Sequence, residues 1–170
     1  SNDATLSSTL TAASLSLNAA MQAGGLNDFE TAATSGAGTD SSKVGVAGSL
    51  AVNLVDTEGE ATIGNGAAVL IGGGAVALTS GDDTTSKASA TPDKASSGST
   101  LGIGASVALN IVANRSLAEV GDGVCIAGTS GHSVDSLDLS ATAVHDIDTE
   151  AEAGSAGAFA LVQVDDQPAK

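Results

Sequence analysis

The chain has 170 residues and a formal net charge of −15 at pH 7, and Ala, Gly, Ser and Thr supply 92 of its residues. Phe29 and Phe159 are its only aromatic residues, which excludes aromatic cages and base-stacking surfaces, and the acidic charge opposes nucleic acid. No apolar stretch reaches the roughly 20 residues of a membrane-spanning helix, so we expect no membrane insertion. An apolar content of 42% still argues for a folded chain, and side chains this small require backbone layers that approach closely.

Residues 1–41 fit two interpretations. Leu6, Leu10, Leu17 and Met21 are spaced like the apolar stripe of a helix. The high Ser and Thr content, and the similarity of residues 14–17 to later segments, favour strands instead. We expect strands here, as the end of a preceding repeat.

In residues 44–54, branched aliphatic residues alternate with Gly, Ala, Ser and Asn, which is the period of a β-strand. One face of this strand is therefore aliphatic and the other small. The small face is expected either to be covered by another layer at short range or to lie outward and nearly flat. Shorter strands are expected at residues 61–63, 68–71 and 75–78, between the Gly-rich segments 64–66 and 72–74, whose glycines supply positive φ at tight corners.

Residues 99–126 repeat residues 42–69, with nine identities in 28 positions. A second set of similar segments, residues 14–17, 75–78 and 136–139, is evenly spaced at a slightly larger offset. Four extra residues around 129–132 reconcile the two offsets, as a small insertion in a turn. A repeat of about 57–61 residues predicts stacked supersecondary units.

We expect one repeat domain: residues 1–41 end a preceding repeat, residues 42–98 form repeat A, residues 99–157 form repeat B, and residues 158–170 start a following repeat. Dividing the repeat by three gives coils of about 19–20 residues, which suits a rung of a parallel β-solenoid. The predicted fold is therefore all-β, a right-handed parallel β-solenoid, or β-helix, of about two and a half repeats. A layered β-sandwich subunit with strand exchange is the alternative.

Residues 44–69 and 101–126 share an order of features. Gly-rich alternation leads to Ala-Val-Asn or Ala-Leu-Asn, then to a short polar segment, and then to Ile-Gly-Asn-Gly-Ala or Val-Gly-Asp-Gly-Val. This order resembles repeats of very large bacterial surface exoproteins, the filamentous-haemagglutinin-like and autotransporter-like adhesins. The resemblance implies a secreted, extracellular or cell-surface β-solenoid that serves spacing, adhesion or self-association, and it carries over no catalytic residues. Because such proteins contain many repeats, we expect this chain to be an excised segment or a polymerising subunit.

The sequence predicts no catalytic or cofactor-binding residues. An acidic row along one strand face offers the oxygen ligands that Ca²⁺ prefers, and its alternative interpretation is a solvated face that keeps the protein soluble and protects a sheet edge. The acids of this row are Asp146, Asp148, Glu150 and Glu152. The other acidic groups, Asp82-Asp83 and Asp56, Glu58 and Glu60, are expected in loops.

His132, His145 and Cys125 do not have the spacing of a metal cage. We expect His132 in an exposed turn and His145 partly buried on a strand. Cys125 stands between Val124 and Ile126, and we expect it to be a small buried hydrophobic residue.

Asn53 and Asn110 occupy the same position in successive repeats, and so do the glycine pairs of the corner that follows. The two amides are expected to hydrogen-bond to each other as a ladder that fixes the register at a corner. The structural glycines are Gly64, Gly66, Gly121 and Gly123.

These features predict a structural or adhesive module that acts as a spacer and assembles end to end into fibres, because a solenoid segment has two open edges. Its expected partners are further copies or adjoining repeats of the same polypeptide, together with a host or cell-surface ligand. One alternative is a pilin-like filament subunit in which residues 1–21 or 158–164 donate a strand. A β-helical enzyme acting on polysaccharide would need a cluster of acids and bases, and the only basic residues are Arg115 and four lysines, so we expect no enzyme.

Overall fold

A computed structural model of the chain describes residues 1–22, 24–36, 44–92, 101–152 and 159–164. All regular secondary structure in these residues is β-strand, as the sequence predicts, and this includes residues 1–35, where a helix was the alternative. The strands are β1 Asn2–Leu6, β2 Leu10–Ala12, β3 Leu15–Ala20, β4 Asn27–Ser35, β5 Val44–Ile63, β6 Ala68–Ile71, β7 Val76–Pro92, β8 Leu101–Val120, β9 Cys125–Gly128, β10 Leu137–Ala151 and β11 Phe159–Val164.

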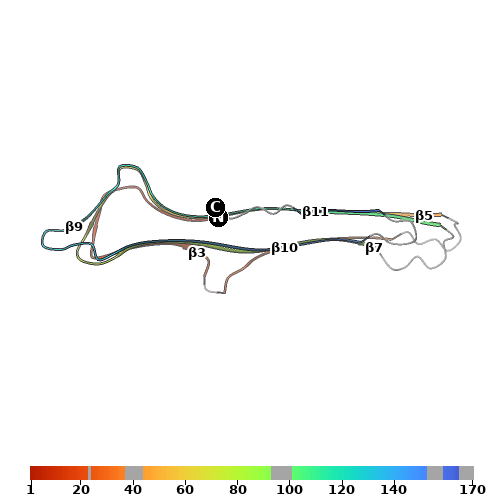
Figure 1. Ribbon diagram of the computed structural model, residues 1–170, viewed down its shortest axis with the longest axis horizontal. Helices are drawn as coiled ribbons and strands as arrows, with labels where there is room; N and C mark the ends of the chain where they lie inside the picture. Colours follow the sequence, from red (N-terminus) through yellow and green to blue (C-terminus); the bar gives the residue numbers. More distant parts are fainter. Residues whose placement is uncertain (23, 37–43, 93–100, 153–158, 165–170) are drawn as a thin grey trace.

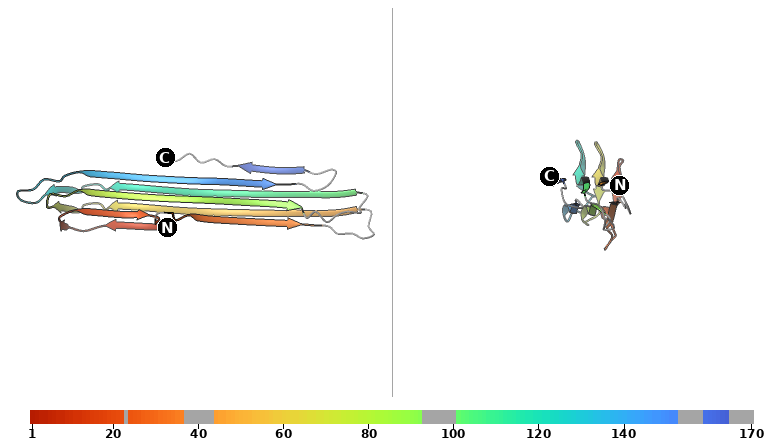
Figure 2. Two further views of the ribbon diagram at one scale, coloured as in Figure 1. Left: turned by 90° about the horizontal axis from the view of Figure 1, so that it is seen from below. Right: turned by 90° about the vertical axis from the view of Figure 1, so that its right-hand side faces the viewer.

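The strands form three sheets, and every pair of neighbouring strands is parallel. The first sheet has the order β1-β5-β8-β11, the second has the order β10-β7-β3 with β4 also beside β7, and the third has the order β2-β6-β9. Figure 1 shows the first two sheets as long layers that face each other, with the short third sheet joining them at the end where β9 is labelled. Figure 2 shows the strands of successive passes lying side by side.

Equivalent segments of the repeats lie beside each other in register. Strand β5 pairs with β8 from Val44↔Leu101 to Ile63↔Val120, at the same offset as the repeated segments of the sequence, and Val52 pairs with Leu109. Strands β3 and β10 both pair with β7 at the offset of the second set of segments, through Val76. The in-register stacking that the sequence predicts is therefore confirmed.

The predicted coil length is wrong. The chain runs through β5, β6 and β7 before β8 returns beside β5, so one circuit takes a whole repeat and not a third of it. Strand β5 alone has 20 residues. The acids expected in a loop, Asp56, Glu58 and Glu60, lie within this strand, because their side chains alternate with buried residues and need no corner to reach solvent.

Turns absorb the differences in length between repeats. The extra residues predicted around 129–132 lie in the loop between β9 and β10, where Gly131 has a φ of 83° and the His132 amide donates to the Thr129 carbonyl at 2.9 Å. A second loop, between β3 and β4, stands where β7 continues straight from Gly81 to Thr84. Insertions of this kind leave the strand register on both sides unchanged.

Two cores fill the space between the sheets. Where the three sheets meet, large side chains are fully buried, among them Ile63, Val69, Ile71, Val76 and Leu78. Between the two long sheets, the buried apolar cluster consists of Ala51, Ala88, Ala90 and Ala108, and Val55 and Val112 are buried nearer the end where the three sheets meet. Of the two expectations for the small face of β5, cover by another layer at short range is therefore confirmed.

Candidate functional site

A row of buried polar side chains, which we call the polar seam, joins the two long sheets at its centre through Asn53, Ser86 and Asn110. The Asn53 Nδ2 group donates to Ser86 Oγ at 2.9 Å, and Ser86 Oγ donates to Asn110 Oδ1 at 2.6 Å. The Asn110 Nδ2 group donates to the Ser86 carbonyl at 2.9 Å. All three residues are buried, so these hydrogen bonds satisfy groups that water does not reach.

The seam continues along the gap on both sides of this centre. Within the first sheet, the buried register partners Ser49 and Ser106 share a hydrogen bond of 2.7 Å between their hydroxyls. Across the gap, the hydroxyls of Thr57 and Thr84 lie 3.3 Å apart. Ser80 Oγ donates to the Gly59 carbonyl at 2.7 Å. Side chains this short hydrogen-bond across the gap only if the two backbones approach closely, so the seam sets the separation of the layers.

The asparagines occupy equivalent positions, but they do not form the ladder that the sequence predicts. Each amide bonds across the gap to the opposite sheet, and Ser86 links the two. They also lie within β5 and β8 rather than at a corner. Sequence analysis missed Ser86 because its register partners in β4 and β10 are Phe29 and Ile147, so the repeat gives no signal at this position.

The glycine corners that follow β5 and β8 have the predicted backbone geometry. Gly66 and Gly123 have φ values of 72° and 69°, a region that residues with a Cβ rarely adopt. The Asp122 amide donates to Asn65 Oδ1 at 2.7 Å, which joins the two corners. Gly121 lies so close to Asn65 that a Cβ there would collide with it. Stacking of equivalent corners therefore requires glycine at this position.

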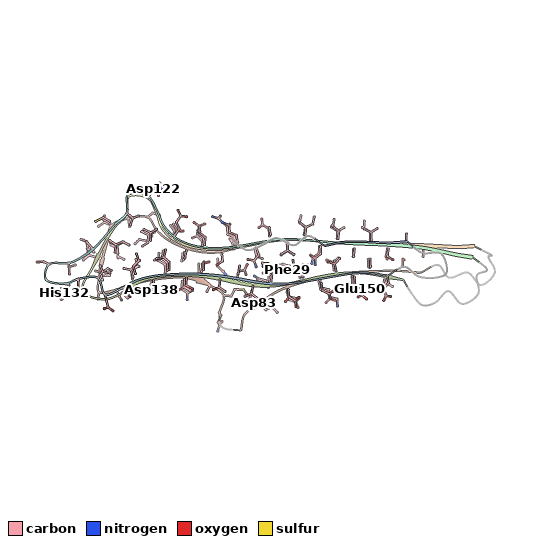
Figure 3. The ribbon with its side chains drawn as sticks, viewed as in Figure 1. Phe29, Asp83, Asp122, His132, Asp138 and Glu150 are labelled. Atoms are coloured by element: carbon pink, nitrogen blue, oxygen red, sulfur yellow. The ribbon has the colours of Figure 1, made fainter. Side chains whose placement is uncertain are left out.

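The acidic row lies on the outer face of β10, where Asp146, Asp148 and Glu150 are exposed (Figure 3 labels Glu150), and exposed Glu152 follows β10 directly. Asp148 lies 3.6 Å from Lys87 Nζ in a solvent-exposed ion pair. Glu150 accepts a long hydrogen bond of 3.5 Å from Ser89. In the described part of the chain, no three His, Cys, Asp or Glu side chains are close enough to hold a metal ion. The row has the exposure of a solvated face.

Asp82 and Asp83 lie within β7 and not in the loop that the sequence predicts. Asp82 faces the interior, where its Oδ1 atom accepts a hydrogen bond of 2.7 Å from Asn27 Nδ2, and Asp83 is exposed. A strand accommodates this pair because successive side chains point to opposite faces. The buried carboxylate therefore helps to join β4 to β7.

The histidines lie where the sequence predicts, whereas the prediction for the cysteine is wrong. His132 is exposed in the turn before β10, and His145 is half-buried on β10. Cys125 is exposed and free, because the alternation of β9 turns Ile126 inward and Cys125 outward. Flanking aliphatic residues do not show which face of a strand a residue takes.

The two open edges of the sheets are the strongest candidate for a functional site. In each sheet, strands from the first 35 residues lie at one edge, and β11, β10 or β9 lies at the other. An edge strand presents a row of unpaired backbone N–H and C=O groups to any strand that can add to it. Every neighbouring pair of strands is parallel and in register. Each edge strand therefore presents the same pattern of backbone groups by which one repeat pairs with the next inside the molecule.

Side-chain exposure shows that the edge strand β10 lacks a neighbour to bury its apolar residues. Val76 and Leu78 of β7 are fully buried, with β3 on one side and β10 on the other. Their register partners on the edge strand β10, Leu137 and Leu139, are 49% and 46% exposed. A repeat therefore buries its apolar residues only when it has a neighbour on both sides.

Comparisons of the chain with protein-family models, with characterised proteins and with solved structures find no match. Among the described residues, there is no helix with the length and apolar character needed to cross a membrane.

Proposed function

We propose that this chain is a structural module: a parallel β-solenoid segment of a secreted bacterial surface or matrix protein that acts as a spacer and associates end to end. The contrast between buried Val76 and Leu78 and half-exposed Leu137 and Leu139 carries the proposal. Another repeat placed against β10 would bury these leucines and pair the free backbone groups of the edge at the same time.

A role as a spacer follows from how the length of such an array grows. Each repeat contacts only its neighbours, so adding repeats extends the molecule by one strand spacing of about 4.8 Å without altering those already in place. The secreted, cell-surface location is supported by the resemblance of residues 44–69 and 101–126 to exoprotein repeats. Adhesion to a host or cell-surface ligand is the further role that this resemblance implies.

The β10 edge can be blocked at Thr149 with little cost to the fold. The Glu152 amide donates to the Ala90 carbonyl at 2.9 Å, so amides of the same parity point toward β7 and the Thr149 amide points to the free edge. The Thr149 hydroxyl has no hydrogen-bond partner among the described residues. Proline at this position therefore removes an edge donor without breaking a bond to β7.

The test compares the wild-type protein with Thr149→Pro by negative-stain microscopy and sedimentation velocity, with and without EDTA. We expect end-to-end fibres of the wild type and short particles of the variant, with similar circular dichroism spectra. Thr149→Val is the matched control, because it keeps the edge donor and should keep the fibres. Wild-type protein that stays monomeric at high concentration, or Thr149→Pro fibres as long as those of the wild type, would contradict the proposal. Loss of fibres in EDTA would assign a structural role to a divalent cation.

Deleting residues 1–21 distinguishes the pilin-like alternative from a continuous solenoid. Strands β1 to β3 pair within the chain, in register with β5, β6 and β7. In a continuous solenoid, the deletion removes the cover of Val76 and Leu78 and should unfold the protein. A folded monomer that no longer polymerises would favour strand donation instead.

A further inference from the structure

The outer face of β5 and β8 carries aliphatic side chains that the described chain does not cover. Leu50 and Leu54 on β5 are 65% and 74% exposed, and Val107 and Ile111 on β8 are 37% and 40% exposed. In-register pairing places Leu50 beside Val107 and Leu54 beside Ile111, so these side chains form one patch. We call it the aliphatic face, and it consists of Leu50, Val52, Leu54, Val107, Leu109 and Ile111.

The aliphatic face does not turn inward, because the polar seam occupies the opposite face of the same strands. A shift of β5 by one residue would place Leu54 in the narrow gap and expose Asn53, with the loss of its hydrogen bond to Ser86. Figure 3 shows side chains on both sides of the upper layer, one set toward the second sheet and one set away from it. Folded monomers rarely expose a continuous apolar patch of more than a few hundred Å² without a binding role.

The size of the face fits a weak contact between copies. The outward positions whose side chains the structure describes, 48–54 on β5 and 105–113 on β8, run for about 20 and 26 Å, and the two strands together are about 10 Å wide. The footprint is therefore on the order of 250 Å², and two copies packed face to face would bury at least about 500 Å², less than the roughly 1,000 Å² of a stable specific interface. We expect a weak dimer, with a dissociation constant in roughly the high micromolar range.

We propose that the aliphatic face binds the same face of a second copy, about a two-fold axis that crosses the strands at Leu50 and Val107. The described outward positions from Gly48 to Leu54 and from Ala105 to Ala113 carry no charge, whereas Asp56 begins a series of outward acids further along β5. An axis across the strands makes the copies antiparallel, so their acidic ends point away from each other. An axis along the strands would keep the copies parallel and place the acidic segment of one copy over the same segment of the other, where Arg115 is already paired with Glu58 at 2.7 Å and the remaining acids would repel.

The chemistry of the face favours a second copy over a lipid surface. The described outward positions of the face include no Lys or Arg that could bind an anionic lipid head group. Two copies of one sheet have the same strand spacing, so each strand of one copy can lie over a strand of the other. Because the proposed axis places each strand over its own copy, the pairing can extend along an array of any length. Lateral pairing of this kind uses different residues from the end-to-end association proposed above.

Charge reversal at the axis tests the pairing. Leu50→Glu and Leu50→Lys each place like charges opposite each other, so in sedimentation equilibrium each should weaken the dimer at least about tenfold. An equimolar mixture of the two should restore a dimer, because the charges then attract. All proteins carry Thr149→Pro so that end-to-end association does not interfere. Thr85→Lys on the outer face of β7, where Asp28 and Asp146 are the register partners, is the control that should leave the dimer unchanged. A monomeric parent protein, or a mixture that stays monomeric, would overturn the proposal.

Cross-linking tests the antiparallel geometry. Single cysteines are introduced with Cys125→Ser, because Cys125 is itself exposed. Packed sheets lie about 10 Å apart, beyond the reach of a disulfide, so a short bismaleimide is used. Leu50→Cys and Val107→Cys should give covalent dimers, whereas two copies of Leu54→Cys should lie about 26 Å apart along the strands and remain uncoupled. Equal coupling at Leu54→Cys, or binding of the face to neutral phosphatidylcholine vesicles in place of dimers, would overturn the proposal.

Discussion

The wide end of the molecule, where three sheets meet, and the narrow body, where two long sheets face each other, solve the same packing problem in opposite ways. At the wide end, Ile63, Ile71 and Leu78 point inward and are fully buried. In the narrow body, alanines and the polar seam point inward, and the large aliphatic residues point outward. The space between the sheets therefore decides which side chains face inward, and hydrophobicity alone does not.

Strand β5 passes through both regions, which makes the comparison direct. Its aliphatic residues are outward at Leu50, Val52 and Leu54, and inward at Val55 and Ile63. The backbone alternation continues unbroken, so the aliphatic set moves from one face to the other within a single strand. Strand β8 follows in register, with Val107 and Ile111 outward and Val112 inward. The change of face begins at Val55, while the polar seam still continues inward at Thr57.

The largest effect is expected from a truncation in the wide end. Ile71→Ala should lower the free energy of unfolding by about 2–5 kcal/mol, because the residue is fully buried and its removal leaves a cavity. Denaturant unfolding monitored by circular dichroism measures this. Val144→Ala, at an exposed position of β10, is the control and should cost much less. Equal losses at the two positions would show that the wide end is not a packed core.

The next effect is expected from enlarging a residue in the narrow body. Ala108→Leu should destabilise by about 1–3 kcal/mol, because the added atoms would force the two long sheets apart. Ala113→Leu makes the same change on the outer face of β8, where Ala113 is exposed, and should be nearly neutral. The difference in denaturation midpoint between the two variants measures how tight the gap is. Similar midpoints would contradict a close approach of the layers.

Loss of the polar seam should cost less than overpacking but remain measurable. Asn110→Ala should lower stability by at least about 1 kcal/mol, because it removes the acceptor of the buried Ser86 hydroxyl and the side-chain donor to the Ser86 carbonyl. A double-mutant cycle with Ser86→Ala should reveal coupling between the two sites. If Asn110→Ala melts at the wild-type temperature, the seam does not contribute to joining the layers.

A corner glycine should show a smaller effect, which depends on backbone conformation alone. Gly123→Ala should cost about 1 kcal/mol, because its φ of 69° is unfavourable for alanine while no atom lies within 4 Å of an added Cβ. Gly123→Asn should recover part of this loss, because asparagine tolerates the left-handed region. Thermal melts of the two variants measure the difference. An asparagine variant that is no better than the alanine variant would point to a steric cause.

The smallest effect on folding is expected at the aliphatic face. Leu54→Thr should change the free energy of unfolding of the monomer by no more than about 0.5 kcal/mol, because the side chain is 74% exposed. Denaturation at low protein concentration measures this. A large loss would mean that Leu54 packs within its own chain, which would remove the contrast between the two regions.

The repeat itself was predictable from the sequence. Parallel strands in register must place equivalent residues side by side, so the offsets between the repeated segments predicted the pairings of Val52 with Leu109 and of Val76 with Leu137. The corner at Gly123 and the turn near His132 were predictable for the same local reason, since glycine and insertions mark turns. The coil length was not, because the sequence does not show that the acids after Leu54 continue the strand.

The register of the repeats and the glycine corners follow from the amino-acid sequence alone, because they depend on the period and on backbone preferences that each segment carries. Which face of each strand lies inside depends instead on how the sheets pack. Ser86 became the link between Asn53 and Asn110, and Cys125 became exposed, through the approach of segments that the repeat does not relate. An alternating strand can place either of its two faces inward, and the width of the gap between the facing sheets determines which face that is.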